Sequence, residues 1–152
     1  MAKFKSRELI VLEANLDNMN PEWSETLMER LFAAGALDVW FQPVVMKKNR
    51  PGILAGALAE PARRDGLLKA FFEESTTLGV RVKPVERFEL ARKLIRVSTP
   101  YGRVEVKAGL GPGGRVLNAA PEYESCKSLA KKKGVPLKKI YQAAFKSFKM
   151  EL

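Results

Sequence analysis

The sequence contains no histidine and a single cysteine, Cys126. Without histidine, the chain lacks the usual protein ligand for transition metals and the usual general base. One cysteine excludes a disulfide within the chain. No apolar run approaches the roughly 18 residues of a membrane span, and the start, "MAKFKSRE", has no apolar signal core. We therefore expect a cytoplasmic protein that does not enter a membrane.

Positive charge is what the sequence has in excess. Its 152 residues include 27 basic and 17 acidic side chains, a net charge of +10. Residues 123–152 alone hold eight lysines and two glutamates. Such a balance favours anionic partners, among them nucleotides, nucleic acids and anionic membranes. The lysine-rich end is equally consistent with a solvated basic tail.

The apolar patterns of residues 8–90 predict the order β-α-β-β-α-β. The expected elements are, in order, 8–16, 21–35, 38–46, 53–59, 62–79 and 80–90. This order is typical of the α+β ferredoxin-like fold, in which the second and fourth strands form the sheet edges. Pro43 and Pro84 fall in those two strands. Because proline is tolerated in strands chiefly at edges, the two prolines support the prediction independently.

Residues 91–152 are expected to extend this core and to pack with it as one unit. Residues 93–110 predict a β-hairpin, and "GPGGRV" predicts a flexible loop before a short strand near Val116. Two helices close the chain, at 121–133 and 136–148. Cys126 falls in the first of them and is expected to be a small core residue.

The first strand ends in polar groups on one face. Because alternate residues of a strand share a face, Glu13, Asn15 and Asp17 are expected to lie together beyond Leu9 and Val11. Their oxygens are the ligands that Mg²⁺ and Mn²⁺ prefer. In the alternative interpretation, the carboxylate at position 17 caps a turn and the one at position 13 pairs with a lysine.

Two further segments carry groups suited to phosphate. The turn "MKKNRPG" places Lys47, Lys48 and Arg50 between two strands, and such cations bind phosphate oxygens. They could instead protect a sheet edge from pairing. The stretch "EESTTLGVR", residues 73–81, gathers hydroxyl groups before Arg81. Alternatively it is simply the end of a helix that stops at Gly79.

Five segments occur in an order and spacing that resemble a known family. They are "LEANLDNM", "AGALDVWFQPVVMKKNRPG", "ESTTLGVR", "TPYGRVEVK" and "PEYESCKSLA". Together they resemble the C-terminal domain of the nickel-insertion protein of lactate racemase cofactor synthesis, a CTP-dependent cyclometallase. The similarity covers nearly the whole chain after Arg7. Because that family also carries an N-terminal domain, we expect this chain to correspond to a C-terminal part, with the N-terminal domain and further copies of itself as partners.

The resemblance implies a reaction. The family inserts Ni²⁺ into pyridinium-3,5-bisthiocarboxylic acid mononucleotide, and the product holds the metal through one carbon and two sulfurs. CTP is the second substrate and gives CMP and pyrophosphate, with Mn²⁺ or Mg²⁺ required. The C-terminal domain is the expected CTP site. Nickel suits imidazole and thiolate ligands, so we do not expect it to be stored on this domain.

The resemblance also implies roles for charged residues, although not a catalytic residue. A triphosphate carries roughly four negative charges, of which one divalent cation neutralises about two. The expected phosphate-binding residues are Lys47, Lys48, Arg50, Arg81, Arg87 and Lys107. The expected ligands of the metal or of its waters are Asp17, Glu13 and Glu74. The family commonly has a second aspartate where this chain has Asn18, which weakens a two-carboxylate site there.

Two other functions are consistent with the sequence. The closing helices, joined through residues 134–136 amid lysines, resemble a helix-turn-helix nucleic-acid module. The second of these helices has no pair of Asn, Gln or Arg placed to read base edges, so nucleic acid is not the expected partner. The other alternative is a ferredoxin-like regulatory domain that binds a small ligand without chemistry.

Overall fold

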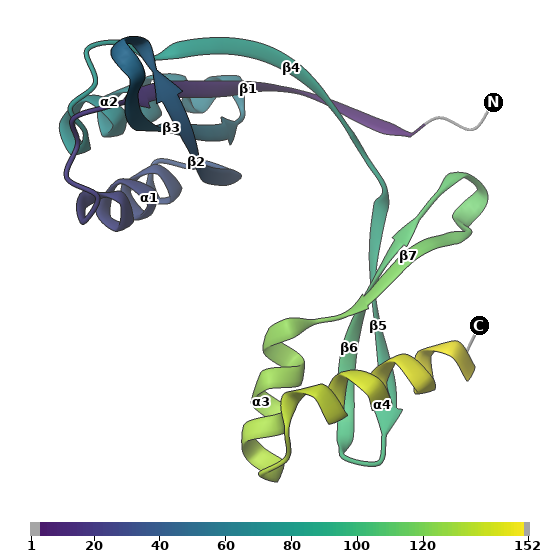
Figure 1. The fold of residues 1–152 in the computed structure, drawn as a ribbon. Helices are drawn as coiled ribbons and strands as arrows, with labels where there is room; N and C mark the ends of the chain where they lie inside the picture. The colour runs from purple at the N-terminus through teal and green to yellow at the C-terminus, as the bar shows by residue number, and fades with distance from the viewer. Residues whose placement is uncertain (1–3, 151–152) are drawn as a thin grey trace. The chain divides into compact units, whose positions relative to one another are not determined.

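The computed structural model describes residues 4–150 and divides the chain into two compact units. The ferredoxin-like unit comprises Ser6–Arg87, and the C-terminal unit comprises Met1–Lys5 with Phe88–Leu152. Figure 1 shows the elements of each unit. No helix within residues 4–150 is long and apolar enough to cross a membrane. That the two segments pack as one unit stays a prediction.

The ferredoxin-like unit has the predicted element order. Its elements are β1 (Lys5–Leu16), α1 (Trp23–Ala33), β2 (Asp38–Met46), β3 (Arg50–Ala59), α2 (Arg64–Glu74) and β4 (Arg81–Glu89). The four strands form a sheet in the order β2-β3-β1-β4. Pro43 and Pro84 therefore lie in the two edge strands, where the missing backbone donor interrupts no inner ladder. The predicted α+β ferredoxin-like class is confirmed.

One face of this sheet packs on both helices. Along β1, residues 10, 12, 14 and 16 are buried while residues 11, 13 and 15 are half-buried, as strand alternation requires. The buried side chains meet Leu27 and Leu31 of α1 and Leu67 and Phe71 of α2 in one core. Strand β3 contributes small residues to this core, at positions 55, 57 and 59, which lets the helices approach the sheet. The opposite face carries no helix of this unit (Figure 1).

Both helices differ from their predicted ends for local reasons. Helix α1 begins at Trp23, two residues later than expected, because Asn20 Oδ1 accepts the Glu22 N–H (3.1 Å) in a preceding turn. Helix α2 ends at Glu74, and Ser75 Oγ donates to the Phe71 carbonyl (2.6 Å). The expectation that α2 stops at Gly79 is wrong, since a serine hydroxyl closes the helix four residues earlier.

The C-terminal unit is a three-stranded sheet covered by two helices. Its elements are β5 (Ala91–Thr99), β6 (Gly102–Leu110), β7 (Val116–Pro121), α3 (Tyr123–Lys133) and α4 (Leu137–Met150). The sheet order is β5-β6-β7, so the predicted hairpin, short strand and closing helices are all present. Gly134 ends α3 in a left-handed conformation. Cys126 is fully buried beside Val104, Val106 and Ile140, so its predicted core role is confirmed.

Candidate functional site

The helix-free face of the ferredoxin-like sheet carries a line of polar side chains. Glu13 and Asn15 project from β1 on the side opposite the buried residues 12, 14 and 16. On the adjacent strand β4, Arg81 and Lys83 are also two residues apart. Across the two strands, Lys83 contacts Glu13 and Arg81 contacts Asn15. The sheet therefore presents charged and amide groups over β1 and β4.

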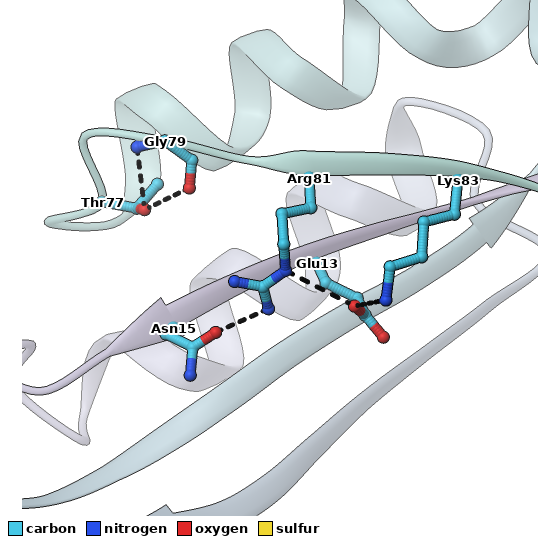
Figure 2. A network of polar contacts seen from close by, with 6 residues as sticks. All are labelled: Glu13, Asn15, Thr77, Gly79, Arg81 and Lys83. Carbon is cyan, nitrogen blue, oxygen red and sulfur yellow. Dashed lines mark hydrogen bonds and ion pairs between the residues drawn. The ribbon is translucent and has the colours of Figure 1, made fainter. Parts of the chain in front are cut away.

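Glu13 lies at the centre of this network (Figure 2). Its Oε2 accepts a hydrogen bond from Lys83 Nζ at 2.8 Å and lies 3.7 Å from Arg81 Nε. Arg81 Nη2 also donates to Asn15 Oδ1 at 2.5 Å. The Lys83 hydrogen bond, with Arg81 adding attraction, lowers the pKa of the Glu13 carboxyl below its ordinary value. The alternative that Glu13 pairs with a lysine is confirmed, and the carboxylate is fixed in place.

The cationic turn lies at the same end of the sheet as Asp17. Arg50 Nη1 is 3.2 Å from Asp17 Oδ2, which joins the start of β3 to the end of β1. Lys48 and Asn49, at φ of 60° and 55°, both adopt the left-handed conformation. That conformation suits a tight hairpin turn but is costly for a lysine. The turn thus holds three exposed cations beside one carboxylate.

The segment after α2 is tied to this end of the sheet. Thr76 Oγ1 donates to Asn18 Oδ1 at 2.6 Å. Thr77 Oγ1 donates to the Gly79 carbonyl (2.9 Å) and accepts its N–H (3.3 Å), which folds the segment into a tight loop before Arg81 (Figure 2). Three segments far apart in sequence, around residues 17, 48 and 77, are therefore connected through side-chain contacts.

The structure brings together some of the sequence-predicted residues and separates others. Glu13, Asp17, Arg50 and Arg81 lie on the helix-free face, with Lys47 and Lys48 in the adjoining turn. Of the three others, Glu74 pairs with Arg30 of α1 at 3.1 Å. Arg87 lies six residues beyond Arg81 on β4, about 20 Å along an extended strand. Lys107 belongs to β6 of the C-terminal unit.

The carboxylates of Glu13 and Asp17 do not form a pair. Glu13 lies within β1, and Asp17 directly follows the last residue of that strand. Four residues of extended chain span about 13 Å, so one ion would contact only one of the two carboxylates. Within residues 4–150 no three Asp, Glu, Cys or His side chains are grouped to hold a metal. Asp17 is followed by Asn18, whose Oδ1 accepts a hydrogen bond from Thr76, and a single carboxylate suits Mg²⁺ or Mn²⁺ carried largely by phosphate oxygens.

Sequence reasoning missed one member of the network, Lys83. The alternation of Arg81 with Lys83 along β4 was an available signal, because alternate residues share a face. Thr76 falls in the hydroxyl-rich stretch that the sequence identified, but its contact with Asn18, 58 residues away, was not predicted. A contact of that kind depends on which strands are neighbours in the sheet.

Comparison with protein families gives a match over most of the chain. Residues 1–141 match the model of a family described as nickel insertion protein. A pyridinium-3,5-bisthiocarboxylic acid mononucleotide nickel insertion protein of Thermotoga petrophila is 46% identical over 93% of this chain and 36% of its own length. The protein of that name in Clostridium kluyveri is 42% identical over 93% of this chain and 35% of its own length. The chain thus spans about a third of these curated relatives.

Solved structures agree with this match. The apo form of LarC2, the C-terminal domain of a cyclometallase involved in the synthesis of the NPN cofactor of lactate racemase, superimposes with a TM-score of 0.89 at 35% identity. The superposition covers 95% of this chain and 99% of that structure. A protein of Methanopyrus kandleri matches with a TM-score of 0.67 at 21% identity, covering 92% of this chain, which shows a shared fold alone.

Proposed function

This chain belongs to the nickel insertion protein family, as a domain of the LarC C-terminal type, and from that membership we propose that it is the CTP- and metal-binding domain of a nickel cyclometallase. The whole enzyme would insert Ni²⁺ into pyridinium-3,5-bisthiocarboxylic acid mononucleotide, the compound named in its relatives. Because the product holds nickel through a carbon, that ring carbon gives up its proton. CTP and water would yield CMP and pyrophosphate.

The single observation that carries this proposal is the convergence of three polar segments at one end of the sheet. Arg50 contacts Asp17, and Thr76 contacts the neighbouring Asn18, so the turn, the strand end and the loop form one continuous polar surface. In our proposal Lys47, Lys48 and Arg50 bind the triphosphate, with Arg81 nearby. Charge-assisted hydrogen bonds from arginine and lysine are the strong contacts available for phosphate oxygens.

A divalent cation fits this surface in a particular way. Asp17 would hold Mg²⁺ or Mn²⁺ that is bound mainly by phosphate oxygens, since these ions usually take one or two carboxylates and keep several waters. The ion would neutralise part of the negative charge of the phosphates. Arg81, Lys83 and Glu13 would remain paired with one another, and Arg50 would exchange its contact with Asp17 for a contact with phosphate.

Isothermal calorimetry with CTP, UTP, ATP and GTP in the presence of Mg²⁺ tests the proposal. We expect CTP to bind most tightly, and we expect Asp17→Asn to weaken CTP binding more when Mg²⁺ is present than when it is removed. Equal affinity for the four nucleotides would reject CTP specificity. Absence of binding by any nucleotide would reject the site.

The charge of the C-terminal unit favours nucleic acid as a second candidate ligand. Ser6–Arg87 contains eleven of the 27 basic residues and twelve of the 17 acidic residues. The C-terminal unit contains the other sixteen basic and five acidic residues. Such a surface attracts any polyanion, with an affinity that falls steeply as salt is added. Fluorescence anisotropy titration with two unrelated 20-mer duplexes distinguishes a specific nucleic-acid module from a surface that is merely basic. Only the specific module would prefer one sequence at 150 mM salt.

A further inference from the structure

The ferredoxin-like unit contains a cavity of 470 Å³ between β1, β4 and the turn that precedes α2. We propose that this cavity binds an aliphatic diamine: one ammonium group pairs with Glu8 of β1 and the other with Glu86 of β4, while the methylene chain lies on the apolar wall. The inference does not depend on CTP binding. It is carried by the lining of the cavity, by two carboxylates without partners and by the pairing of the two strands.

The cavity is lined mainly by apolar groups. They include Ile10 of β1, Pro84 of β4 and Pro61, which begins the turn Pro61–Arg63 before α2. The volume falls within the roughly 300–1,000 Å³ of small-molecule sites, which are mostly apolar with a few polar groups. The polar residues of the lining are Glu8 and Glu86, and both are exposed. A ligand that fits this lining has an apolar body and positive charge.

The two carboxylates project to the same face of the sheet. Lys83 contacts Glu13 on the helix-free face, and alternate residues of a strand share a face. The even-numbered residues of β1 and β4 therefore lie on the side of the helices, in agreement with the position of Ile10 in the helix-packed core. Glu8 and Glu86 belong to this even-numbered set, so they lie on the opposite side from the polar network of Figure 2.

The strand pairing sets the separation of the two carboxylates. Side-chain contacts join positions 13 and 83, and positions 15 and 81, as expected for antiparallel strands. Continued along the strands, this pairing puts Glu86 opposite Ile10 and diagonal to Glu8. Diagonal neighbours in a sheet are about 7–8 Å apart. That separation suits two ammonium groups joined by a short methylene chain.

Neither carboxylate has a partner in the part of the chain that the structure describes. No ion pair or side-chain hydrogen bond within residues 4–150 involves Glu8 or Glu86. The nearby carboxylate of Glu60, next to Pro61, is already paired with Arg7. Two like charges beside an apolar wall repel each other, and a molecule with two linked positive charges pairs with both.

The same lining argues against a metal ion as the ligand. Mg²⁺ and Ca²⁺ take six or more oxygen ligands, several of them waters or carbonyl groups. Among residues 4–150 there is no group of three Asp, Glu, Cys or His side chains that could hold a metal, and the rest of this lining is apolar. An ammonium group requires only hydrogen-bond acceptors, and a carboxylate supplies these.

Pro84 favours a small ligand over an extended peptide. Strand β4 is at the edge of the sheet, and a proline there has no N–H to donate to an added strand. A peptide pairing with the main chain of β4 would therefore lack a hydrogen bond beside the cavity. A diamine needs no such pairing, because its methylene groups pack on Pro84 and Ile10.

Proton–nitrogen correlation spectra of the labelled chain during titration with putrescine test the site. We expect saturable shifts in the millimolar range at the amides of Glu8, Ile10 and Glu86. Butylamine, which has the same carbon chain and one ammonium group, should bind about 2- to 5-fold more weakly, the effect of one exposed ion pair. Shifts of the same size with Mg²⁺, or shifts spread over all acidic residues, would overturn the inference.

Variants of the folded chain give an independent test. Glu8→Gln with Glu86→Gln should weaken putrescine binding about 4- to 25-fold, the product of two such pairs. Glu25→Gln with Glu29→Gln, at exposed positions of α1, is the matched control and should leave binding unchanged. Pro84→Phe, which narrows the cavity and keeps both carboxylates, should also weaken binding. Unchanged binding in either cavity variant, or an equal loss in the control, would overturn the inference.

A peptide of equal charge distinguishes a free diamine from lysine side chains of a partner protein. The blocked dipeptide acetyl-Lys-Lys-amide carries the same two ammonium groups as putrescine on a larger body. We expect it to bind more weakly at the amides of the cavity. Tighter binding of the dipeptide than of putrescine would show that the cavity receives a protein segment, and would overturn a free diamine as its ligand.

Discussion

At the scale of single residues, Glu13 is the acidic group whose ionisation depends most clearly on the fold. Its partners Lys83 and Arg81 come from a strand 68 to 70 residues away, so the contacts exist only in the folded chain. They lower the pKa of the carboxyl in the folded state. By linkage, the folded protein then holds this proton less tightly than the unfolded chain does.

The lowered pKa predicts how stability depends on pH. Wild type should exceed Glu13→Gln by roughly 0.2–1 kcal/mol in the free energy of unfolding at pH 7, the range for largely exposed pairs. This difference should persist down to the ordinary carboxyl pKa of about 4.3 and disappear as the pH falls through the lower folded value. Urea unfolding of both proteins between pH 7 and pH 3 measures it.

A partner variant provides the control for this pH dependence. When Lys83→Met removes the main donor to Glu13, the additional change Glu13→Gln should alter stability much less, because the two residues share one interaction. A stability difference between wild type and Glu13→Gln that stays constant from pH 7 to pH 3 would contradict the linkage.

Lys48 predicts a conflict between stability and binding. Its φ of 60° lies in the left-handed region, where an L-residue pays roughly 1–2 kcal/mol that glycine does not. Lys48→Gly should therefore raise the free energy of unfolding by up to about 1 kcal/mol, since the looser unfolded chain offsets part of the gain. It should also weaken CTP binding, because one cation is lost. Chemical unfolding and calorimetry on the same variant measure both, and a gain in stability with unchanged affinity would show that Lys48 does not contact phosphate.

At the scale of elements, the β2–β3 turn can be tested as a unit. We expect Lys48→Ala with Arg50→Ala to weaken CTP binding by two to four decades, because each charge-assisted contact contributes roughly 1.5–3 kcal/mol. Binding to wild type should also weaken with added salt. Calorimetry at two salt concentrations measures both effects.

The matched control removes two cations from another element. Arg64 and Lys69 are exposed on α2, so Arg64→Ala with Lys69→Ala changes the net charge equally without touching the turn. If the control double variant loses as much affinity as the turn variant, the effect is one of net charge. If the turn serves to protect the sheet edge, the turn variant should keep its affinity and aggregate more readily.

At the scale of the whole molecule, the connection between the two units is very short. Strand β4 ends at Glu89 and β5 begins at Ala91, with Leu90 alone between them. Each unit also has its own hydrophobic core. That the two segments pack as one unit is a prediction from the sequence, and unfolding experiments test it.

This expectation predicts the form of the thermal unfolding curve. The intact chain should unfold in a single calorimetric transition whose calorimetric and van't Hoff enthalpies agree. A fragment ending at Leu90 should melt at a lower temperature than the intact chain. Two separate transitions in the intact chain would contradict packing as one unit and would support two independent domains.

Exposed apolar side chains predict self-association. Trp23 and Phe32 of α1 and Phe72 of α2 are each between 46% and 49% exposed, and aromatic residues on a surface commonly mark interfaces. Sedimentation velocity at micromolar concentration should therefore show a species larger than 17.0 kDa, and Phe32→Asp with Phe72→Asp should shift it toward the monomer. Sedimentation as a monomer at all concentrations would contradict the prediction.

The sequence by itself determined the order of the elements and much of their character. Apolar periodicity is a local property, so it located the strands and helices, and Pro43 and Pro84 indicated the sheet edges before any pairing was known. The burial of Cys126 was predicted from its position in a helix and from how often a free cysteine is buried. Part of the candidate site was also singled out from the sequence, namely the end of β1, the cationic turn and Arg81.

Tertiary structure decided which of these residues meet. Asp17 contacts Arg50 and Glu13 contacts Lys83 across 33 and 70 residues of sequence, and such contacts depend on strand order and register, which no local pattern specifies. Glu74, by contrast, pairs with Arg30 of α1, because both helices pack on the opposite face of the sheet. The register set Trp40 over Gly56 in the row of Glu13, because a side chain can cross a neighbouring strand only where that strand has no side chain of its own.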